Sequence, residues 1–248
     1  MAHYVSDDGK GFGMVQPREY TRAEKARNWW HYHAGWIIFA AVLIFGFAYF
    51  IHDMFFRPRP DYQIAFVTTR DVPSAVRANL QTRLEELGED VNGDGRVQVE
   101  LLVYPLGFDT QSQINVDATS TSVTRLTVDL TTGRVYLVLL DDPEGFQKRI
   151  GALGYLDGSA PDTADATHGA ANWRQMAYSW ENCPVLSGLD LGTYLPFTAP
   201  DGGEKDGQSV MTGIYIARRA LRSEVQEQSF SADTQLWETL TANAVPLP

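Results

Sequence analysis

The densest group of side chains able to do chemistry is a run of alternating polar residues in the first half of the chain. Asp90, Asn92 and Asp94 place oxygen ligands at the first, third and fifth positions of a calcium-binding loop. Gly95 follows as the turn glycine, and Arg96 supplies a backbone carbonyl at the seventh position. The sequence therefore predicts a calcium site.

The second half of this loop departs from the calcium-binding pattern. The last position normally holds a bidentate Glu, and Leu101 stands there instead. The alternative interpretation is a turn without metal, which a cluster of Asp, Asn and Gly favours by itself. The loop joins a predicted helix to a predicted strand, so it lies opposite the sheet edge where α/β proteins bind ligands. We therefore expect any calcium here to be structural.

A second group of candidates follows the ends of predicted strands, which is where open α/β sheets bind ligands. Thr69 and Arg70 come after the first buried run, and Asp141 comes after the third. Asp141 is preferred over its neighbour because Asp142 is expected to cap a helix. These three residues are candidate ligand contacts. The simpler alternative for Asp141 is a solvated carboxylate at the start of a helix.

The remaining reactive side chains do not form a catalytic set. Trp173 and Trp180 are candidates for stacking on a ligand, although large aromatics more often cover a core. His168 is the only His after residue 52, Cys183 is the only Cys, and no phosphate-binding loop or nucleophile elbow occurs. A binding or accessory function is therefore favoured. Two alternatives stay open: a surface hydrolase that pairs Asp141 with a distant carboxylate, and a structural subunit of a membrane-associated complex.

Apolar, β-branched and aromatic runs predict the strands that position these candidates. The predicted strands are 62–68, 97–104 and 134–140. The predicted helices are 72–87, 111–131 and one that begins at Pro143. We expect Asp71 to cap the first helix. The second helix is ambiguous because its many Thr residues favour a strand, but parallel strands need a crossover, and a helix is its usual form.

The order β-α-β-α-β-α over residues 61–153 predicts an α/β fold with a doubly wound, mostly parallel sheet. Residues 154–207 are rich in Gly, Pro, Asp and scattered aromatics, and we expect long connections there. A strand at 210–217 and a helix at 231–242 are predicted to close the chain.

The stretch Ala34–Ile51 is apolar and carries no formal charge. At about 1.5 Å per residue, a helix of this length just covers a hydrocarbon core of about 30 Å. Aromatic residues crowd both ends, as in the headgroup zone of a bilayer. We therefore predict a single-pass protein, with the bilayer contacted through Ala34–Ile51. A buried core helix and a cleaved signal peptide are the alternatives.

The predicted organisation follows from this span. Its parts are a cytoplasmic tail at 1–33, a transmembrane helix at 34–51, a juxtamembrane linker at 52–60 and an extracytoplasmic α/β domain at 61–248. Four basic residues lie before the span and three follow it, which favours a cytoplasmic N-terminus in the plasma membrane. The four are Arg18, Arg22, Lys25 and Arg27.

Charge and cysteine content narrow the possible partners. Residues 1–53 hold five basic and five acidic residues, so the net charge of -11 belongs entirely to the rest of the chain. Such an acidic domain argues against nucleic acid, since binding there neutralises phosphates with Lys and Arg. A small molecule or a membrane protein is the expected partner. The single Cys excludes an internal disulfide.

Several stretches together resemble the first lobe of extracytoplasmic solute-binding proteins of the type II periplasmic-binding class. They are YQIAFVT, VQVELLVYPL, VYLVLLDDPEGFQ, RIGALGYLDG and TGIYIARRAL. The resemblance implies a solute-binding-like lobe to which the last of these stretches returns as a strand. This chain departs from that family in two ways. Its predicted anchor is an N-terminal helix rather than a lipid-modified Cys, and the domain of about 190 residues is long enough for one lobe rather than two.

The polar loop carries two resemblances of its own. Its D-x-N-x-D-G core resembles the calcium loops of dockerin-like repeats, without the partner helix. The junction of helix, loop and strand around it is similar to that of uncharacterised membrane-anchored surface proteins of Gram-positive bacteria. The second resemblance implies a cell-surface setting.

Overall fold

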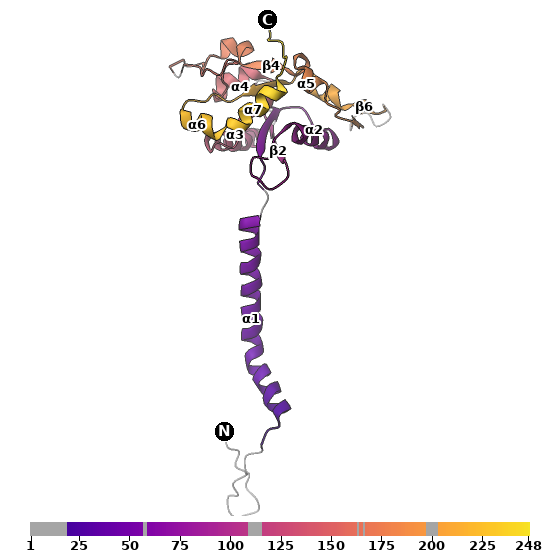
Figure 1. The fold of residues 1–248 in the computed structure, drawn as a ribbon, viewed down its shortest axis with the longest axis vertical. Coiled ribbons are helices and arrows are strands. Elements are labelled where there is room, and N and C mark those ends of the chain that lie inside the picture. Colours follow the sequence, from indigo (N-terminus) through magenta and orange to yellow (C-terminus); the bar gives the residue numbers. More distant parts are fainter. Residues whose placement is uncertain (1–18, 57–58, 109–115, 163, 166, 197–202) are drawn as a thin grey trace, which may run out of the picture. The chain divides into compact units, whose positions relative to one another are not determined.

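The computed structural model describes residues 19–56, 59–108, 116–162, 164–165, 167–196 and 203–248 (Figure 1). The chain divides into two compact units, with the boundary between Pro58 and Arg59. The first unit contains helix α1, and the second is the folded domain. Residues 1–18 of the predicted tail and residues 57–58 of the predicted linker lie outside the described residues.

Helix α1 (Arg22–Phe56) contains the whole apolar stretch Ala34–Ile51 and extends into the first residues of the predicted linker. A capping box closes its N-terminus. The Glu24 backbone N–H donates to the Thr21 hydroxyl at 3.3 Å, and the Thr21 backbone N–H donates to the Glu24 carboxylate at 3.0 Å. The helix thus extends beyond the apolar stretch at both of its ends.

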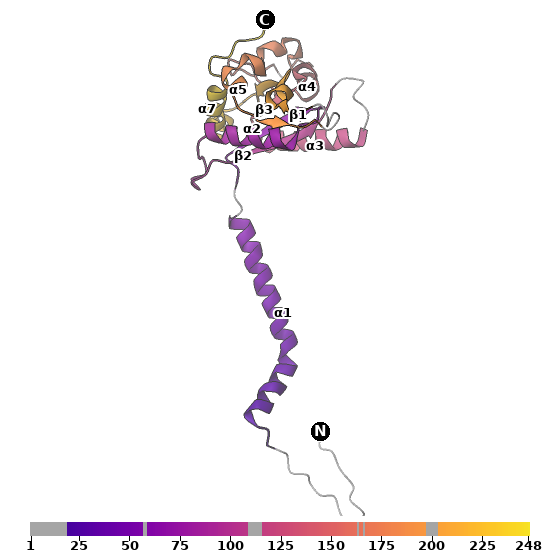
Figure 2. The ribbon, with the colours of Figure 1, turned by 90° about the vertical axis from the view of Figure 1, so that its right-hand side faces the viewer.

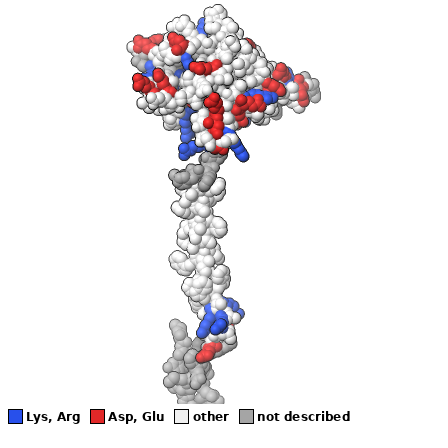
Figure 3. Space-filling model, viewed as in Figure 1, with Lys and Arg blue, Asp and Glu red and all other residues white. Residues whose placement is uncertain are grey.

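Among the described residues, α1 is the one helix that is long and apolar enough to cross a membrane, with a mean hydropathy of 2.3 over its most apolar 18 residues. A signal sequence near an N-terminus passes the same test. Figure 3 shows the apolar stretch as surface without charge, with basic side chains at its N-terminal end. This distribution is typical of a segment that contacts lipid.

A mixed five-stranded sheet lies at the centre of the folded unit, in the order β2-β1-β3-β7-β4. The strands are β1 (Tyr62–Thr68), β2 (Val99–Pro105), β3 (Leu137–Leu140), β4 (Ala177–Ser179) and β7 (Tyr215–Arg218). β1 pairs in parallel with both β2 and β3. β7 is antiparallel to β3 and to β4, so β4 points in the same direction as the first three strands. The domain is therefore a mixed α/β fold.

Alternation along β1 divides the core between the two faces of the sheet. The covering helices are α2 (Ser74–Leu87), α3 (Val116–Thr131), α4 (Pro143–Ile150), α5 (Pro184–Ser187) and α7 (Ser231–Leu240). Ile64 and Phe66 pack in a cluster with α2, α5 and α7. Ala65 and Val67 pack in a second cluster with α3 and α4. Both faces are covered, which is why the strands are continuous apolar runs.

The predicted start of the helix at Pro143 and the predicted end of the helix 111–131 are confirmed. The Asp142 side chain accepts a hydrogen bond from the Gly145 backbone N–H at 2.9 Å, and Pro143 occupies the first turn of α4. Gly133 follows α3 with a φ of +72°, a conformation that favours glycine. The ambiguous stretch is helical from Val116. Residues 109–115, which include its predicted start, lie outside the described part of the chain.

The predicted role of Asp71 as a helix cap is wrong. The N-cap residue of α2 is Pro73, and no side chain caps this helix. Pro73 restricts the residue before it to extended conformations, so the helix cannot begin ahead of the proline. Asp71 lies two residues too early to reach the first turn.

The second half of the domain contains more elements than predicted. Residues 154–207, expected as connections, include η1 (Ala170–Gln175), β4, η2 (Trp180–Asn182), α5, β5 (Thr193–Tyr194) and β6 (Lys205–Asp206). The predicted strand 210–217 is shorter, because η4 (Gly207–Met211) takes its first residues and β7 begins at Tyr215. Helix α6 (Glu224–Ser229) was not predicted, whereas α7 begins at the predicted Ser231.

The carboxyl of Asp233, in the first turn of α7, makes the free energy of unfolding depend on pH. Burial raises the pKa of its carboxyl from 3.8 to about 7, against a smaller opposing effect of a backbone hydrogen bond. Between these values the folded chain keeps a proton that the unfolded chain releases, so the free energy of unfolding falls as pH rises. We expect Asp233→Asn to raise the free energy of unfolding by about 1–3 kcal/mol near pH 8, and much less near pH 4.

Urea unfolding of the full chain in detergent, followed by Trp fluorescence at both pH values, measures this difference. Glu238→Gln is the matched control, because Glu238 is exposed on the same helix. An equal gain from Asp233→Asn at both pH values would contradict the assignment.

Candidate functional site

The strand order creates a switch point at the carboxyl ends of β1 and β3, which lie side by side (Figure 2). The chain leaves β1 through α2, on one face of the sheet, towards β2. It leaves β3 through α4, on the other face, and continues to β4 at the opposite end of the strand order from β2. Ligands of open α/β sheets bind outside the carboxyl ends of strands at such a point.

Asp141 follows β3 and faces the residues that follow β1. Its Oδ2 accepts hydrogen bonds from the Thr68 hydroxyl at 2.7 Å and from the Thr69 backbone N–H at 3.1 Å. The Thr68 hydroxyl oxygen in turn accepts the Arg70 backbone N–H at 3.0 Å. The side chain of Asp141 is 18% exposed, so this carboxylate is held in place but remains open to solvent.

Arg70 completes the predicted group. Its Nε lies 3.9 Å from Asp141 Oδ2, and its Nη1 donates to the Thr212 carbonyl at 2.7 Å. The Arg70 side chain is 42% exposed. Thr69, Arg70 and Asp141 are therefore brought together, as the sequence predicted. An exposed ion pair of this length contributes little to stability.

Glu181 belongs to the same edge and was not predicted. Its Oε1 accepts the Gly213 backbone N–H at 2.8 Å, and its Oε2 accepts the Ser179 hydroxyl. Burial acts to raise the pKa of Glu181, but these hydrogen bonds and the charge of Arg70 outweigh it and hold the pKa below its ordinary value. Glu181 is thus an ionised carboxylate. No local sequence signal marks it, because β4 and β7 bring it to this edge.

The two predicted tryptophans differ in their surroundings. Trp173 is half-buried, and its ring meets that of Tyr215 edge-on at 5.4 Å. Tyr215 pairs with Leu140, so Trp173 lies near the same edge as Asp141. Trp180 is 2% exposed and donates its indole N–H to Gln208 Oε1 at 2.8 Å. The prediction of Trp180 as a ligand contact is therefore wrong, because its ring fills the core.

The predicted metal loop is exposed and closed by its own side chains. The Asp90 carboxylate accepts the backbone N–H groups of Gly93 and Gly95, at 2.7 and 2.8 Å. Asn92 Oδ1 accepts that of Asp94, and Asp94 Oδ1 accepts that of Arg96, both at 2.9 Å. These bonds describe a turn of Asp and Asn residues. Each carboxylate oxygen keeps a further lone pair, so the donor set is compatible with calcium.

Asp61, at the start of β1, fixes this loop to the sheet. Its Oδ1 accepts the backbone N–H groups of Val91 and Asn92, at 2.8 and 2.9 Å. Its Oδ2 accepts that of Gln98 at 2.8 Å. This role of Asp61 was not predicted. An Asp that immediately precedes a buried strand was the available signal.

Cys183 and His168, the two isolated reactive side chains, both pack within the fold. Cys183 is fully buried, and burial, assisted by the charge of Glu181, raises the pKa of its thiol to about 12. Such a thiol is not a nucleophile near neutral pH. The His168 carbonyl accepts the Gln147 side-chain amide at 2.6 Å, and its ring lies close beside Gly151.

Comparison with known proteins gives no relative: no family model, no curated protein and no solved structure matches this chain.

Proposed function

We propose that this chain is a membrane-anchored extracytoplasmic binding or accessory module that holds a small polar solute at the carboxyl edge of its sheet. The convergence of Arg70 and Asp141 at the switch point carries this proposal. Neither side chain belongs to the hydrophobic core, and both reach solvent. A site assembled from the ends of separate strands is the usual form of a binding site in this fold class.

The charges of the site favour a solute with an amino group. Asp141 and Glu181 supply two carboxylates, and Arg70 supplies one guanidinium, so the group carries a net negative charge. An amino group would pair with the carboxylates, and a carboxylate on the same solute would pair with Arg70. A free amino acid carries both groups. We propose amino acids as the first solute class to test.

The strand arrangement supports the resemblance to a solute-binding lobe. Four strands share one direction, and β7 returns between β3 and β4, as the resemblance implies for the stretch TGIYIARRAL. A doubly wound, mostly parallel sheet is part of this proposal. A hydrolase is less well supported, because its general acid needs a raised pKa, whereas the pKa of Glu181 is lowered.

The binding proposal predicts a thermal shift. We expect the full chain in detergent to melt at a higher temperature with an amino acid from a panel that also contains sugars and short peptides. Asp141→Asn and Arg70→Gln should each weaken the interaction about tenfold or more, because each removes a charged hydrogen-bonding partner. The control is Arg77→Gln, an exposed arginine on α2. A shift that both site variants retain would place the ligand elsewhere, and no shift with any of these solutes would overturn the proposal.

The location of the module is a separate proposal. The uncharged stretch of α1 and the basic residues at its N-terminal end support a membrane anchor with the folded domain outside. Protease treatment of intact cells should therefore degrade residues 61–248 without lysis. A tag at the C-terminus reports the loss, and a cytoplasmic protein serves as the control. Survival of the domain until lysis would refute this orientation.

We also propose that the loop Asp90–Arg96 binds structural calcium, supported by its oxygen donors and its exposed position. Three side chains and one carbonyl fall short of the usual six to eight ligands, so the Kd should be on the order of 10⁻⁴ to 10⁻³ M. At about ten times that Kd, calcium adds about 1.4 kcal/mol to the free energy of unfolding.

This proposal predicts a higher melting temperature in millimolar calcium than in EDTA. Asp94→Ala should remove the difference because it deletes one oxygen ligand. Asp190→Asn is the control, since Asp190 is another exposed carboxylate in a turn. Identical melting of the unaltered chain in calcium and in EDTA would show that the loop is only a turn.

A further inference from the structure

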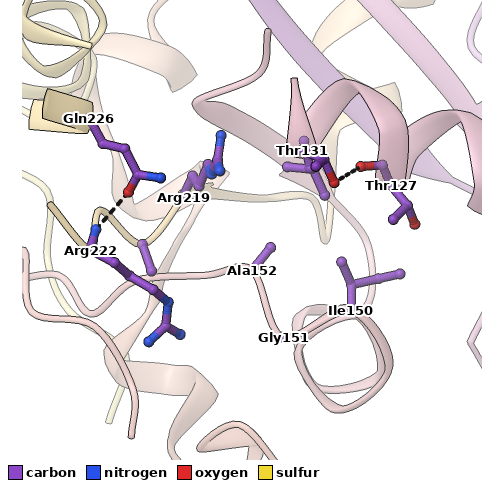
Figure 4. Close-up of a pocket in the computed structure, with 10 residues that line it drawn as sticks. Thr127, Thr131, Ile150, Gly151, Ala152, Arg219, Arg222 and Gln226 are labelled. Carbon is purple, nitrogen blue, oxygen red and sulfur yellow. Dashed lines mark hydrogen bonds between the residues drawn. The ribbon is translucent and has the colours of Figure 1, made fainter. Parts of the chain in front are cut away.

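A cavity of about 220 Å³ lies at the opposite edge of the sheet from Arg70 and Asp141 (Figure 4). Arg219 helps to line it, and the backbone N–H of Arg219 donates to the Tyr136 carbonyl just before β3 begins. The cavity therefore lies near the amino end of β3. The last turns of α3 and α4 form the other wall, through Leu130 and Ile150.

Arg219 lines this cavity and has a buried hydrogen-bond donor beside it that is unused within the described part of the chain. Its Nη1 is buried and has no hydrogen-bond partner among the described residues. The guanidinium lies 5.6 Å from the centre of the Phe230 ring, a contact that leaves its N–H groups free. Burial also lowers the pKa of the Arg219 guanidinium. A buried cationic donor without an acceptor destabilises the fold, and an anion bound beside the guanidinium would lower that cost.

The side chains beside Arg219 also offer donors. Arg222 lines the cavity and donates from Nη1 to the Pro161 carbonyl at 3.2 Å, which leaves further N–H groups. Gln226 Oε1 accepts the Arg222 backbone N–H at 2.8 Å. This bond uses the oxygen of the Gln226 amide, so the N–H donors of that amide remain available. Figure 4 shows Arg219, Arg222 and Gln226 on one side of the cavity, with Thr131 and Ile150 on the other.

The electrostatic balance of the cavity favours an anion. None of its lining residues, all of which the structure describes, is Asp or Glu, although the chain as a whole has a net charge of -11. The C-terminal ends of α3 and α4 each contribute about half a negative charge. Two guanidinium groups outweigh them. The Thr127 and Thr131 hydroxyls donate to backbone carbonyls, at 2.8 and 2.6 Å, so their hydrogens are not available to an anion.

We propose that this cavity is a second binding site, which takes a small organic carboxylate with a short aliphatic body. The planar fork of an arginine matches a carboxylate in two parallel hydrogen bonds. The cavity is larger than a bare inorganic anion needs, since a water molecule occupies about 30 Å³ of liquid. Leu130, Ile150, Ala152 and Ala220 provide an apolar wall for the aliphatic part. The site is independent of the one at the carboxyl edge.

Calorimetric titration of the full chain in detergent, at constant ionic strength, tests this assignment. Butyrate is the probe, butyramide is its uncharged counterpart, and inorganic phosphate is an anion without an aliphatic body. We expect saturable binding of butyrate and at least about tenfold weaker binding of the other two, because the site uses both the charge and the apolar wall.

Variants locate the site. Arg222→Gln and Arg219→Lys should each weaken butyrate binding about tenfold, the first by removing a charge and the second by removing the fork. Arg222 is exposed, so its variant keeps the test valid if Arg219→Lys fails to fold. Arg77→Gln, on the opposite face of the sheet, should bind normally. The proposal is overturned if butyrate does not bind, if butyramide or phosphate binds as well, or if both site variants bind unchanged.

Discussion

The need to pair both edges of β3 is the constraint on which the folded unit depends. All four residues of this strand are buried, so no water can satisfy its backbone N–H and C=O groups. β1 pairs with one edge in parallel, and β7 pairs with the other in antiparallel. Because β7 lies far along the chain, the sheet is complete only when Tyr215–Arg218 has returned to the first strands.

This return of β7 shapes both edges of the sheet. Before the strand, Thr212 and Gly213 reach the carboxyl edge and bond Arg70 and Glu181. After the strand, Arg219 reaches the amino edge and lines the cavity there. The same four-residue strand thus joins an edge with two carboxylates to an edge with two guanidinium groups. The proposed solutes at the two edges differ for this reason.

Polar groups inside the domain are stabilised by defined partners. The Tyr104 hydroxyl donates to Asp129 Oδ2 at 2.6 Å, and Arg125 and Arg134 lie within 3.9 and 3.7 Å of that carboxylate. Burial and the nearby carboxylate raise the pKa of Tyr104, so its phenol remains a donor. Such partners allow α3 to pack over the sheet despite a buried acid. Among the described residues, Arg219 is the exception, with a buried donor left without a partner.

The sequence by itself determined the local elements of the first half of the domain. The apolar run Tyr62–Thr68 is β1 without a change of boundary, and Asp142 caps α4 as its position before a proline indicates. Even the Thr-rich stretch is a helix. There the hydroxyls of Thr124 and Thr127 donate to carbonyls four residues earlier, which a strand does not allow. The strand and the cap depend on neighbours within one turn or one strand, so periodicity and capping rules are sufficient for them. The Thr-rich helix was predicted from the crossover that parallel strands need.

Only the tertiary structure decided which distant residues meet. Thr69, Arg70 and Asp141 were predictable as a group, because parallel strands bring their carboxyl ends to one edge. Glu181 was not, since its place depends on the insertion of β7 between β3 and β4. Trp180 was assigned to a ligand although it fills the core, and Arg219 gave no signal at all. Burial and long-range pairing depend on contacts across the whole domain, which local sequence patterns do not contain.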